Sequence, residues 1–189
     1  MPRRLRVPAA VFATLAVLAA HSVEARADQR DARLDGLFAR LQSTVSGSAA
    51  QAIEQRIWHL WSEAGDPRVA RLLQEGVLAM SQARFRVALE RFDRMVARAP
   101  DFAEGWNKRA TLHYLMGNYS ASVGDIQRTL DLEPRHFGAL SGLGLIYDAV
   151  EEPAAALRSF EAAVAINPHL QSIEQRIIEL RRQLAGRPT

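Results

Sequence analysis

The chain has 189 residues, of which 48% are hydrophobic and 7% aromatic, and it contains no cysteine. The lack of cysteine excludes disulfides, thiolate metal sites, a cysteine nucleophile and a lipidated cysteine. Residues 1–27 hold four of the 24 basic residues and one of the 21 acidic residues, so the remainder is formally neutral. A neutral body argues against a general nucleic-acid or anionic-membrane surface, because such a surface needs a concentrated positive field.

Residues 1–27 have the layout of a secretory signal peptide. Three arginines near the start precede an uncharged, mostly apolar stretch over 7–20, and Ala25–Arg26–Ala27 supplies a small-x-small cleavage site. The apolar stretch is short for a bilayer-spanning helix, which needs roughly 20 residues. We therefore expect cleavage after Ala27 and export to the bacterial periplasm. An uncleaved anchor in the inner membrane is the alternative.

Residues 28–67 predict two helices, over about 30–43 and 48–64, with a break at Ser46–Gly47–Ser48. The second helix carries an apolar stripe with two tryptophans, Trp58 and Trp61, before Gly65–Asp66–Pro67 ends it. A disordered leader is the alternative, and the tryptophans and the stripe argue against it.

Three prolines, Pro100, Pro134 and Pro168, recur at one fixed spacing along the chain. A repeat with this period predicts a stack of similar units, and small residues at the eighth position of each unit would let its two helices cross closely. The units lie within 68–170 and span 69–102, 103–136 and 137–170, with Gly76, Ala110 and Gly144 at the eighth position.

The middle unit carries the fullest motif, with Trp106 near its start, Gly117–Asn118–Tyr119 in its middle and Leu130 to Pro134 at its end. The third unit adds Leu143–Gly144 and Tyr147. With these residues the chain resembles the tetratricopeptide repeat family, whose pattern is W-x2-L-G-x2-Y, then A-x3-F, then P. The resemblance implies an all-α fold, an α-solenoid that forms a right-handed superhelix of helix–turn–helix repeats.

The ends of such a solenoid need covers. Residues 171–184 place Ile173, Ile177, Leu180 and Leu184 on one stripe of an otherwise charged helix, so 171–189 is predicted to be a capping helix with a short tail. At the other end, the divergent helix pair of 28–67 is expected to stack on the first repeat.

The sequence offers little for catalysis. No histidine has a metal-ligand spacing, no serine stands in a nucleophile-elbow motif, and there is no glycine-rich phosphate loop. His136 and His169 follow the prolines in the turns between repeats, where solvent-exposed polar residues are expected. His113 occupies a packing position inside a repeat. We therefore predict no enzymatic activity, no metal and no cofactor.

The resemblance implies a concave groove lined by the first helix of each unit, and it assigns the groove to fixed positions of the repeat. Carried over to this chain, those positions are Leu73, Val77 and Met80 in the first unit, Glu104, Asn107, Lys108, Thr111 and Tyr114 in the second, and Ser141, Leu145 and Asp148 in the third.

This surface predicts a scaffold or adaptor of the bacterial envelope that binds an extended or helical peptide segment of another protein. Asn107 and Lys108 would hydrogen-bond its backbone or an acidic group, while Tyr114, Leu73 and Met80 would contact apolar side chains. The basic clamp of heat-shock co-chaperones needs several Lys, Arg and Asn residues around one point, and it is not expected here. No nucleic acid is expected as a partner, and no membrane after signal cleavage.

A self-associating structural element is the alternative function. In that case Trp58 and Trp61, or the apolar end formed by Leu73, Val77 and Met80, would pack against a second copy and give a homo-oligomer.

Overall fold

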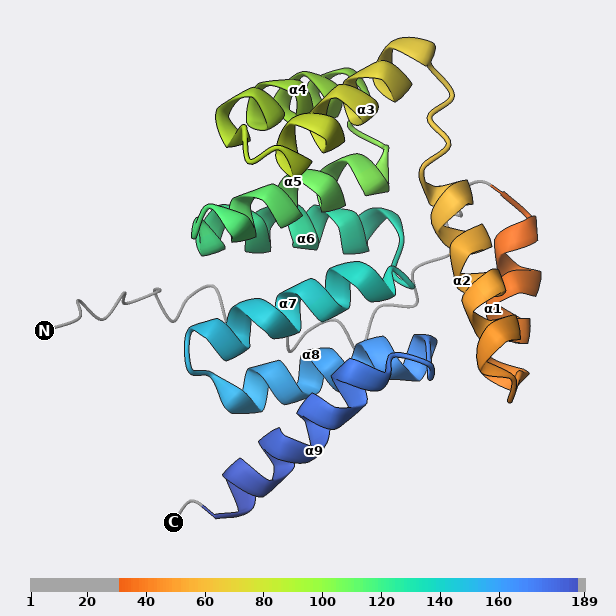
Figure 1. The fold of residues 1–189 in the computed structure, drawn as a ribbon, viewed down its shortest axis with the longest axis vertical. Coiled ribbons are helices and arrows are strands. Elements are labelled where there is room, and N and C mark those ends of the chain that lie inside the picture. The colour runs from red at the N-terminus through yellow and green to blue at the C-terminus, as the bar shows by residue number, and fades with distance from the viewer. Residues whose placement is uncertain (1–30, 187–189) are drawn as a thin grey trace, which may run out of the picture.

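A computed structural model describes residues 31–186, and all regular secondary structure in that range is α-helical. Figure 1 shows a layered stack of helix pairs with two further helices at its side. The expected signal peptide of residues 1–27 lies outside the described residues. Among the residues described, no helix is long and apolar enough to cross a membrane.

The helices follow the predicted repeat closely. Each unit of the stack consists of a first and a second helix, and the helix pair near the N-terminus and the last helix lie outside the units. In chain order the helices are α1 (Arg33–Ser43), α2 (Gly47–Trp61), α3 (Pro67–Ser81), α4 (Phe85–Arg98), α5 (Ala103–Leu115), α6 (Tyr119–Leu132), α7 (Phe137–Ala149), α8 (Pro153–Ile166) and α9 (Gln171–Ala185).

Close helix crossing explains the small residue at the eighth position of each unit. A Cβ atom on Gly76 would lie 2.3 Å from the Phe92 ring, and one on Gly144 would lie 2.4 Å from the Phe160 ring. Both rings are fully buried, so neither has room to move aside. In the middle unit the Ser122 hydroxyl donates a hydrogen bond of 2.7 Å across the same crossing. The predicted role of the small residues is therefore confirmed.

The turn inside each unit uses a left-handed backbone at one repeated position. Ala83, Gly117 and Glu151 occupy the fifteenth position of the three units and have φ angles of 55°, 74° and 60°. Only the middle unit places glycine there, although glycine adopts this conformation without steric cost. Pro153 and Pro67 begin α8 and α3, where the missing N–H has no helical partner to lose.

The N-terminal pair does not stack on the first repeat, and that expectation was wrong. Its core is shared with Phe137 at the start of α7 and with Ile166 and Leu170 at the end of the third unit. Polar bonds join the same regions: His169 Nε2 lies 3.0 Å from the Leu41 carbonyl oxygen. In Figure 1, α1 and α2 run beside the ends of the stacked helices. The pair is ordered, so the alternative of a disordered leader does not hold for residues 31–64.

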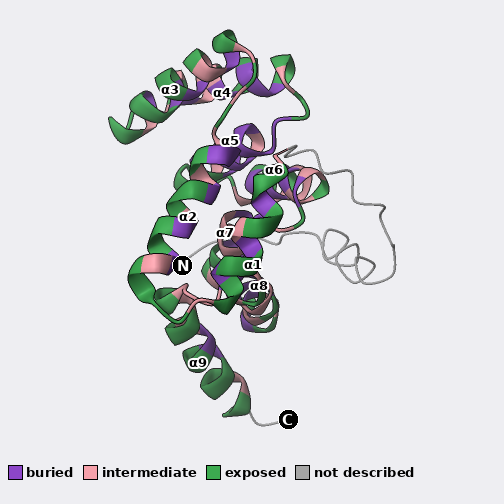
Figure 2. Cartoon of the chain, turned by 90° about the vertical axis from the view of Figure 1, so that its right-hand side faces the viewer, coloured by how far each residue is buried: buried purple, intermediate pink, exposed green. Residues whose placement is uncertain are grey.

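The last helix, α9, packs on α8 through Ile177 and Leu180, which are buried. Its other faces are mostly exposed, as Figure 2 shows. Arg176 of α9 also forms an ion pair of 2.6 Å with Asp148 at the end of α7. This helix therefore closes the third unit with a polar outer surface, as a solenoid cap requires.

Candidate functional site

The first helices of the units, α3, α5 and α7, lie next to one another and present a common row of exposed residues. Val77, Thr111 and Leu145 occupy the ninth position of the three units, and all three are exposed. Val77 is 36% exposed and Leu145 is 42% exposed, although both are large and apolar. Leu115, one turn beyond Thr111, is 50% exposed. We call these four residues, with Met80, the first-helix face.

The other predicted groove residues differ in how much of their side chain remains available. Leu73 is 8% exposed and belongs to the core of the first repeat, so it does not line a surface. Tyr114 is half-buried, with its ring 5.7 Å from the Tyr119 ring. The Ser141 hydroxyl donates to its own helix backbone. Asp148 is held by Arg176 through two hydrogen bonds.

The polar residues at the start of α5 form a buried cluster instead of a groove floor. Asn107 Nδ2 donates to Glu104 Oε2 at 2.8 Å, and His136 Nε2 lies 3.1 Å from the same oxygen. Lys108 Nζ lies 2.8 Å from Glu104 Oε1. Glu104 and His136 have no solvent exposure, and Asn107 has 7%.

Helix α2 covers this cluster with its two tryptophans. The Trp61 ring stacks on the His136 ring at 4.1 Å with an interplanar angle of 9°. Lys108 Nζ lies 5.4 Å from the Trp58 ring centroid, within the range of a cation–π contact. Gly138 leaves the space that Trp58 fills, because a Cβ atom there would lie 2.5 Å from the indole. Helix α2 therefore occupies the part of the predicted groove that lies over the start of α5 and α7.

Hydrogen bonding fixes the tautomer of His136. The Ala139 backbone N–H donates to His136 Nδ1 at 3.1 Å, so Nδ1 is an acceptor and Nε2 carries the proton that reaches Glu104. Burial is the largest effect on the pKa of Glu104 and raises it. The contacts with His136 and Lys108 act in the opposite direction, the hydrogen bond from His136 most strongly, and the pKa lies below its ordinary value of 4.5.

Three sequence expectations are corrected by this arrangement. Glu104 and Asn107 are buried, and Glu104 Oε2 already accepts from Asn107 Nδ2 and lies within hydrogen-bond distance of His136, so these two residues do not line an open groove. His136 is a buried helix cap, not a solvated turn residue. His169 is only partly exposed and is held by its bond to α1. In the sequence, the two tryptophans of α2 were the available signal for this contact, because an apolar stripe that carries tryptophan has to pack against another surface.

A second polar group lies between α4, α5 and α6. Arg109 donates to Asp125 at 2.7 Å and to Asp93 at 2.7 Å, and Asp125 is buried. His113 Nε2 lies 3.9 Å from Asp125. The bond to Asp93 joins the second unit to the first, whereas the contacts with Asp125 lie within the second unit, so this group has a structural role. Within 31–186, no group of three or more His, Asp or Glu side chains is placed to hold a metal ion.

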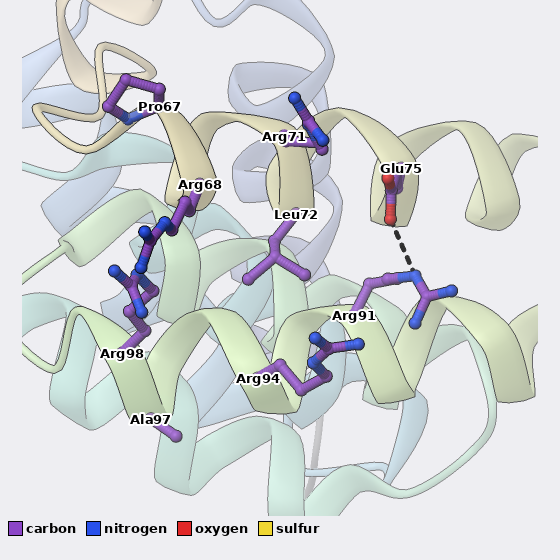
Figure 3. A pocket seen from close by; sticks show the side chains of 9 residues that line it. All are labelled: Pro67, Arg68, Arg71, Leu72, Glu75, Arg91, Arg94, Ala97 and Arg98. Atoms are coloured by element: carbon purple, nitrogen blue, oxygen red, sulfur yellow. Dashed lines mark ion pairs between the residues drawn. The ribbon is translucent and has the colours of Figure 1, made fainter.

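Sequence reasoning missed an open cavity of about 810 Å³ on the outer side of α3 and α4. Figure 3 shows it between the two helices, with Leu72 pointing into the space between them. Its other distinctive feature is a set of five arginines, namely Arg68, Arg71, Arg91, Arg94 and Arg98. The spacing of these arginines along two adjacent helices was a visible signal, but the N-terminal pair was expected to stack on this first repeat.

Comparison with known proteins agrees with the observed repeats. A family model described as tetratricopeptide repeat matches residues 73–123 and 107–170. A TPR repeat-containing protein of Rhizobium etli is 36% identical over 157 residues, which is 83% of this chain and 77% of that protein.

Two solved structures show the same fold at low identity. The TPR2B-domain:pHsp70 complex of yeast Sti1 has a TM-score of 0.58 at 21% identity, covering 62% of this chain and 99% of that one. The crystal structure of MamA has a TM-score of 0.59 at 21% identity, covering 81% of this chain and 82% of that one. The three ordered units, the family model and the Rhizobium relative together show that this chain belongs to the tetratricopeptide repeat family.

Proposed function

We propose that this protein is a non-enzymatic interaction scaffold whose first-helix face binds a peptide segment of a partner protein. The observation that carries the proposal is the exposed row of Val77, Thr111 and Leu145, at the same position in three successive units. Val77 and Leu145 keep apolar side chains in water at this position, which favours an apolar partner surface. The Sti1 domain was solved as a complex with pHsp70, so the fold accommodates such a partner.

The geometry limits where a segment would lie. Helix α2 already covers the start of α5, so the free part of the face is the half that contains Met80, Thr111 and Leu115. Burial of Val77, Leu115 and Leu145 would supply affinity at about 25 cal/mol per Å² of apolar area. The polar residues predicted to line the groove, Asn107, Lys108 and Ser141, already bond within the protein. Contacts to the segment would therefore be mainly apolar.

The test is capture of the partner by matched variants. Val77→Asp with Leu145→Asp places two charges in the proposed contact, while Ile178→Asp places one on α9, where Ile178 is 48% exposed. A partner captured from native extract and cross-linked to the first-helix face should be lost with the double variant and kept with Ile178→Asp. Retention by the double variant would remove this surface from consideration.

We propose further that the protein works in the bacterial cell envelope. This rests on residues 1–27 alone, which have the charge, apolar stretch and cleavage site of a signal peptide. Intact-mass measurement of the protein recovered from the periplasm should give a chain that begins at Asp28. A mass that retains residues 1–27, in the membrane fraction, would instead indicate the anchored form.

Self-association is the second candidate, and one part of it is corrected. Trp61 has no solvent exposure and Trp58 packs against α7, so the tryptophans do not supply a dimer contact. The exposed apolar residues at the end of α3, Val77 and Leu78, support the other version. Sedimentation at rising concentration separates the candidates, since only self-association gives a mass that increases and returns to the monomer value with Val77→Asp.

A further inference from the structure

The outer face of the first repeat is open, whereas the same face is covered in the next repeat. In the second unit, Trp106 Nε1 donates to the Pro100 carbonyl at 3.0 Å, and Arg109 pairs with Asp93 of the preceding α4 at 2.7 Å. The equivalent positions of the first unit hold Leu72 and Glu75, which line the cavity of about 810 Å³. We call this surface, between α3 and α4, the end face.

The end face is open because α1 and α2 pack elsewhere. In Figures 1 and 2, α3 and α4 form one end of the stack, and the N-terminal pair lies along the side. Inside a solenoid, the face that corresponds to the end face packs against the preceding unit. The end face keeps that helical geometry, with Leu72 and Ala97 as its apolar part, but no described residue fills it.

The chemistry of the end face is strongly cationic. Among its five arginines, Arg91 is paired with Glu75 at 2.9 Å and Arg98 with Asp66 at 2.8 Å. The other three, Arg68, Arg71 and Arg94, form no such ion pair with any described residue. Arg71 and Arg94 make no side-chain hydrogen bond or ion pair within residues 31–186, and they come from different helices across the cavity (Figure 3).

We propose that the end face binds an acidic α-helix of a partner protein, which would stack on α3 and α4 as each second helix stacks on the following unit. Carboxylates on one side of that helix would pair with Arg71 and Arg94, and its apolar side chains would cover Leu72. The Arg109–Asp93 ion pair already joins two units of this chain by the same chemistry. This inference does not rest on the first-helix face.

Charge also decides against a symmetric dimer formed through two end faces. Two end faces brought together would place like charges opposite each other, which costs several kcal/mol in protein interfaces. Outside residues 1–27 the chain is formally neutral, so the arginines of the end face are a local feature. A local cationic surface with helical shape fits one acidic helix better than an extended polyanion.

The test uses a labelled helical peptide with glutamates at i, i+4 and i+7 beside a leucine stripe, and a matched peptide with glutamine at those positions. Binding to the full mature protein is followed by fluorescence anisotropy. Arg71→Glu with Arg94→Glu should weaken binding of the glutamate peptide roughly tenfold. Arg40→Glu with Arg182→Glu changes the net charge equally at exposed sites on α1 and α9, and should leave the affinity unchanged.

Several outcomes would overturn the proposal. These are equal affinity for the two peptides, equal loss in both double variants, or a single-stranded DNA that competes at the same site more tightly than the glutamate peptide. Backbone amide shifts confined to α3 and α4 would support it. Val77→Asp with Leu145→Asp should not change peptide binding, so failure here and failure of the first-helix proposal are distinguishable.

Discussion

The glycines of α7 show how finely the repeat specifies side-chain size. Gly144 faces the Phe160 ring, which lies 2.4 Å from the position of an added Cβ atom. Gly142, half a turn away, has only Ile126 Cδ1 nearby, at 3.6 Å. Close packing therefore requires a glycine at position 144 but not at position 142, although both lie inside the same helix.

We expect opposite effects when each is replaced by alanine. Gly144→Ala should destabilise the protein by about 1–3 kcal/mol, because the extra methyl overpacks a closed crossing. Gly142→Ala should stabilise it by up to about 1 kcal/mol, since alanine has the higher helix propensity. Urea unfolding of both variants measures the difference, and equal effects would show that the crossing has room.

The turn inside each unit offers a second test at single residues. Ala83 adopts a left-handed backbone with φ of 55°, as Gly117 does at the same position of the next unit. A left-handed conformation costs an L-residue about 1–2 kcal/mol, while glycine loses some of that gain in chain entropy. Ala83→Gly should therefore raise the free energy of unfolding by about 0.5 kcal/mol.

The control for this turn is the same substitution inside a helix. Ala121→Gly, at an exposed position of α6, should lower the free energy of unfolding by about 1 kcal/mol. If thermal or urea unfolding gave the same sign for both variants, backbone strain at Ala83 would not be the controlling effect.

At the scale of elements, the sequence predicted each helix of the repeats because the same local signals recur in every unit. It predicted two helices in the N-terminal segment for a similar local reason. It did not predict where that pair docks, because Trp61 meets His136 and Leu41 meets His169 at sequence separations that no local pattern encodes. The burial of Glu104 follows from that docking, so it was missed too.

The contact of α2 with α5 and α7 predicts a specific pH dependence. Glu104 has a lowered pKa in the folded protein, so its charge adds stability that is fully present above the unfolded value of 4.5 and is lost as the pH falls through 4.5 towards the folded pKa. Glu104→Gln should cost about 2 kcal/mol at neutral pH. The difference between wild type and variant should shrink below pH 4.5.

Urea unfolding of the two proteins between about pH 3 and 7 measures this difference. Asp66, whose pKa is also lowered by its hydrogen bonds to the Arg68 backbone and to Arg98, remains in both proteins and cancels in the comparison. A difference that stayed constant with pH would mean that Glu104 contributes by packing and not by charge.

For the whole molecule, the N-terminal pair changes how the repeats unfold. An open solenoid unfolds as a chain of neighbouring units, and its ends can fray separately. Here Glu54 of α2 accepts a hydrogen bond of 3.2 Å from Asn167, and Asp35 of α1 pairs with Arg135 at 2.6 Å. The first and last parts of the described chain are therefore coupled through the same core.

We expect a single cooperative transition as the result. In a Trp106→Phe background, tryptophan fluorescence reports on α2 alone, while far-ultraviolet circular dichroism reports on all helices. The two midpoints in urea should coincide. Trp61→Ala removes a fully buried indole, should cost about 3–5 kcal/mol, and should separate the two midpoints. Separate midpoints already in the parent protein would contradict the coupling.

The docking of α1 on residues of the second and third units also sets an order of events during synthesis. Asp35 and its partner Arg135 are 100 residues apart in the chain. At ribosomal rates of about 5–20 residues per second, the first helix emerges roughly 5–20 s before the residues that cover it. Phe38 and the apolar residues around it lack part of their cover throughout that interval, so α1 reaches its final packing only after the second and third units have been made, and until then it needs protection by chaperones.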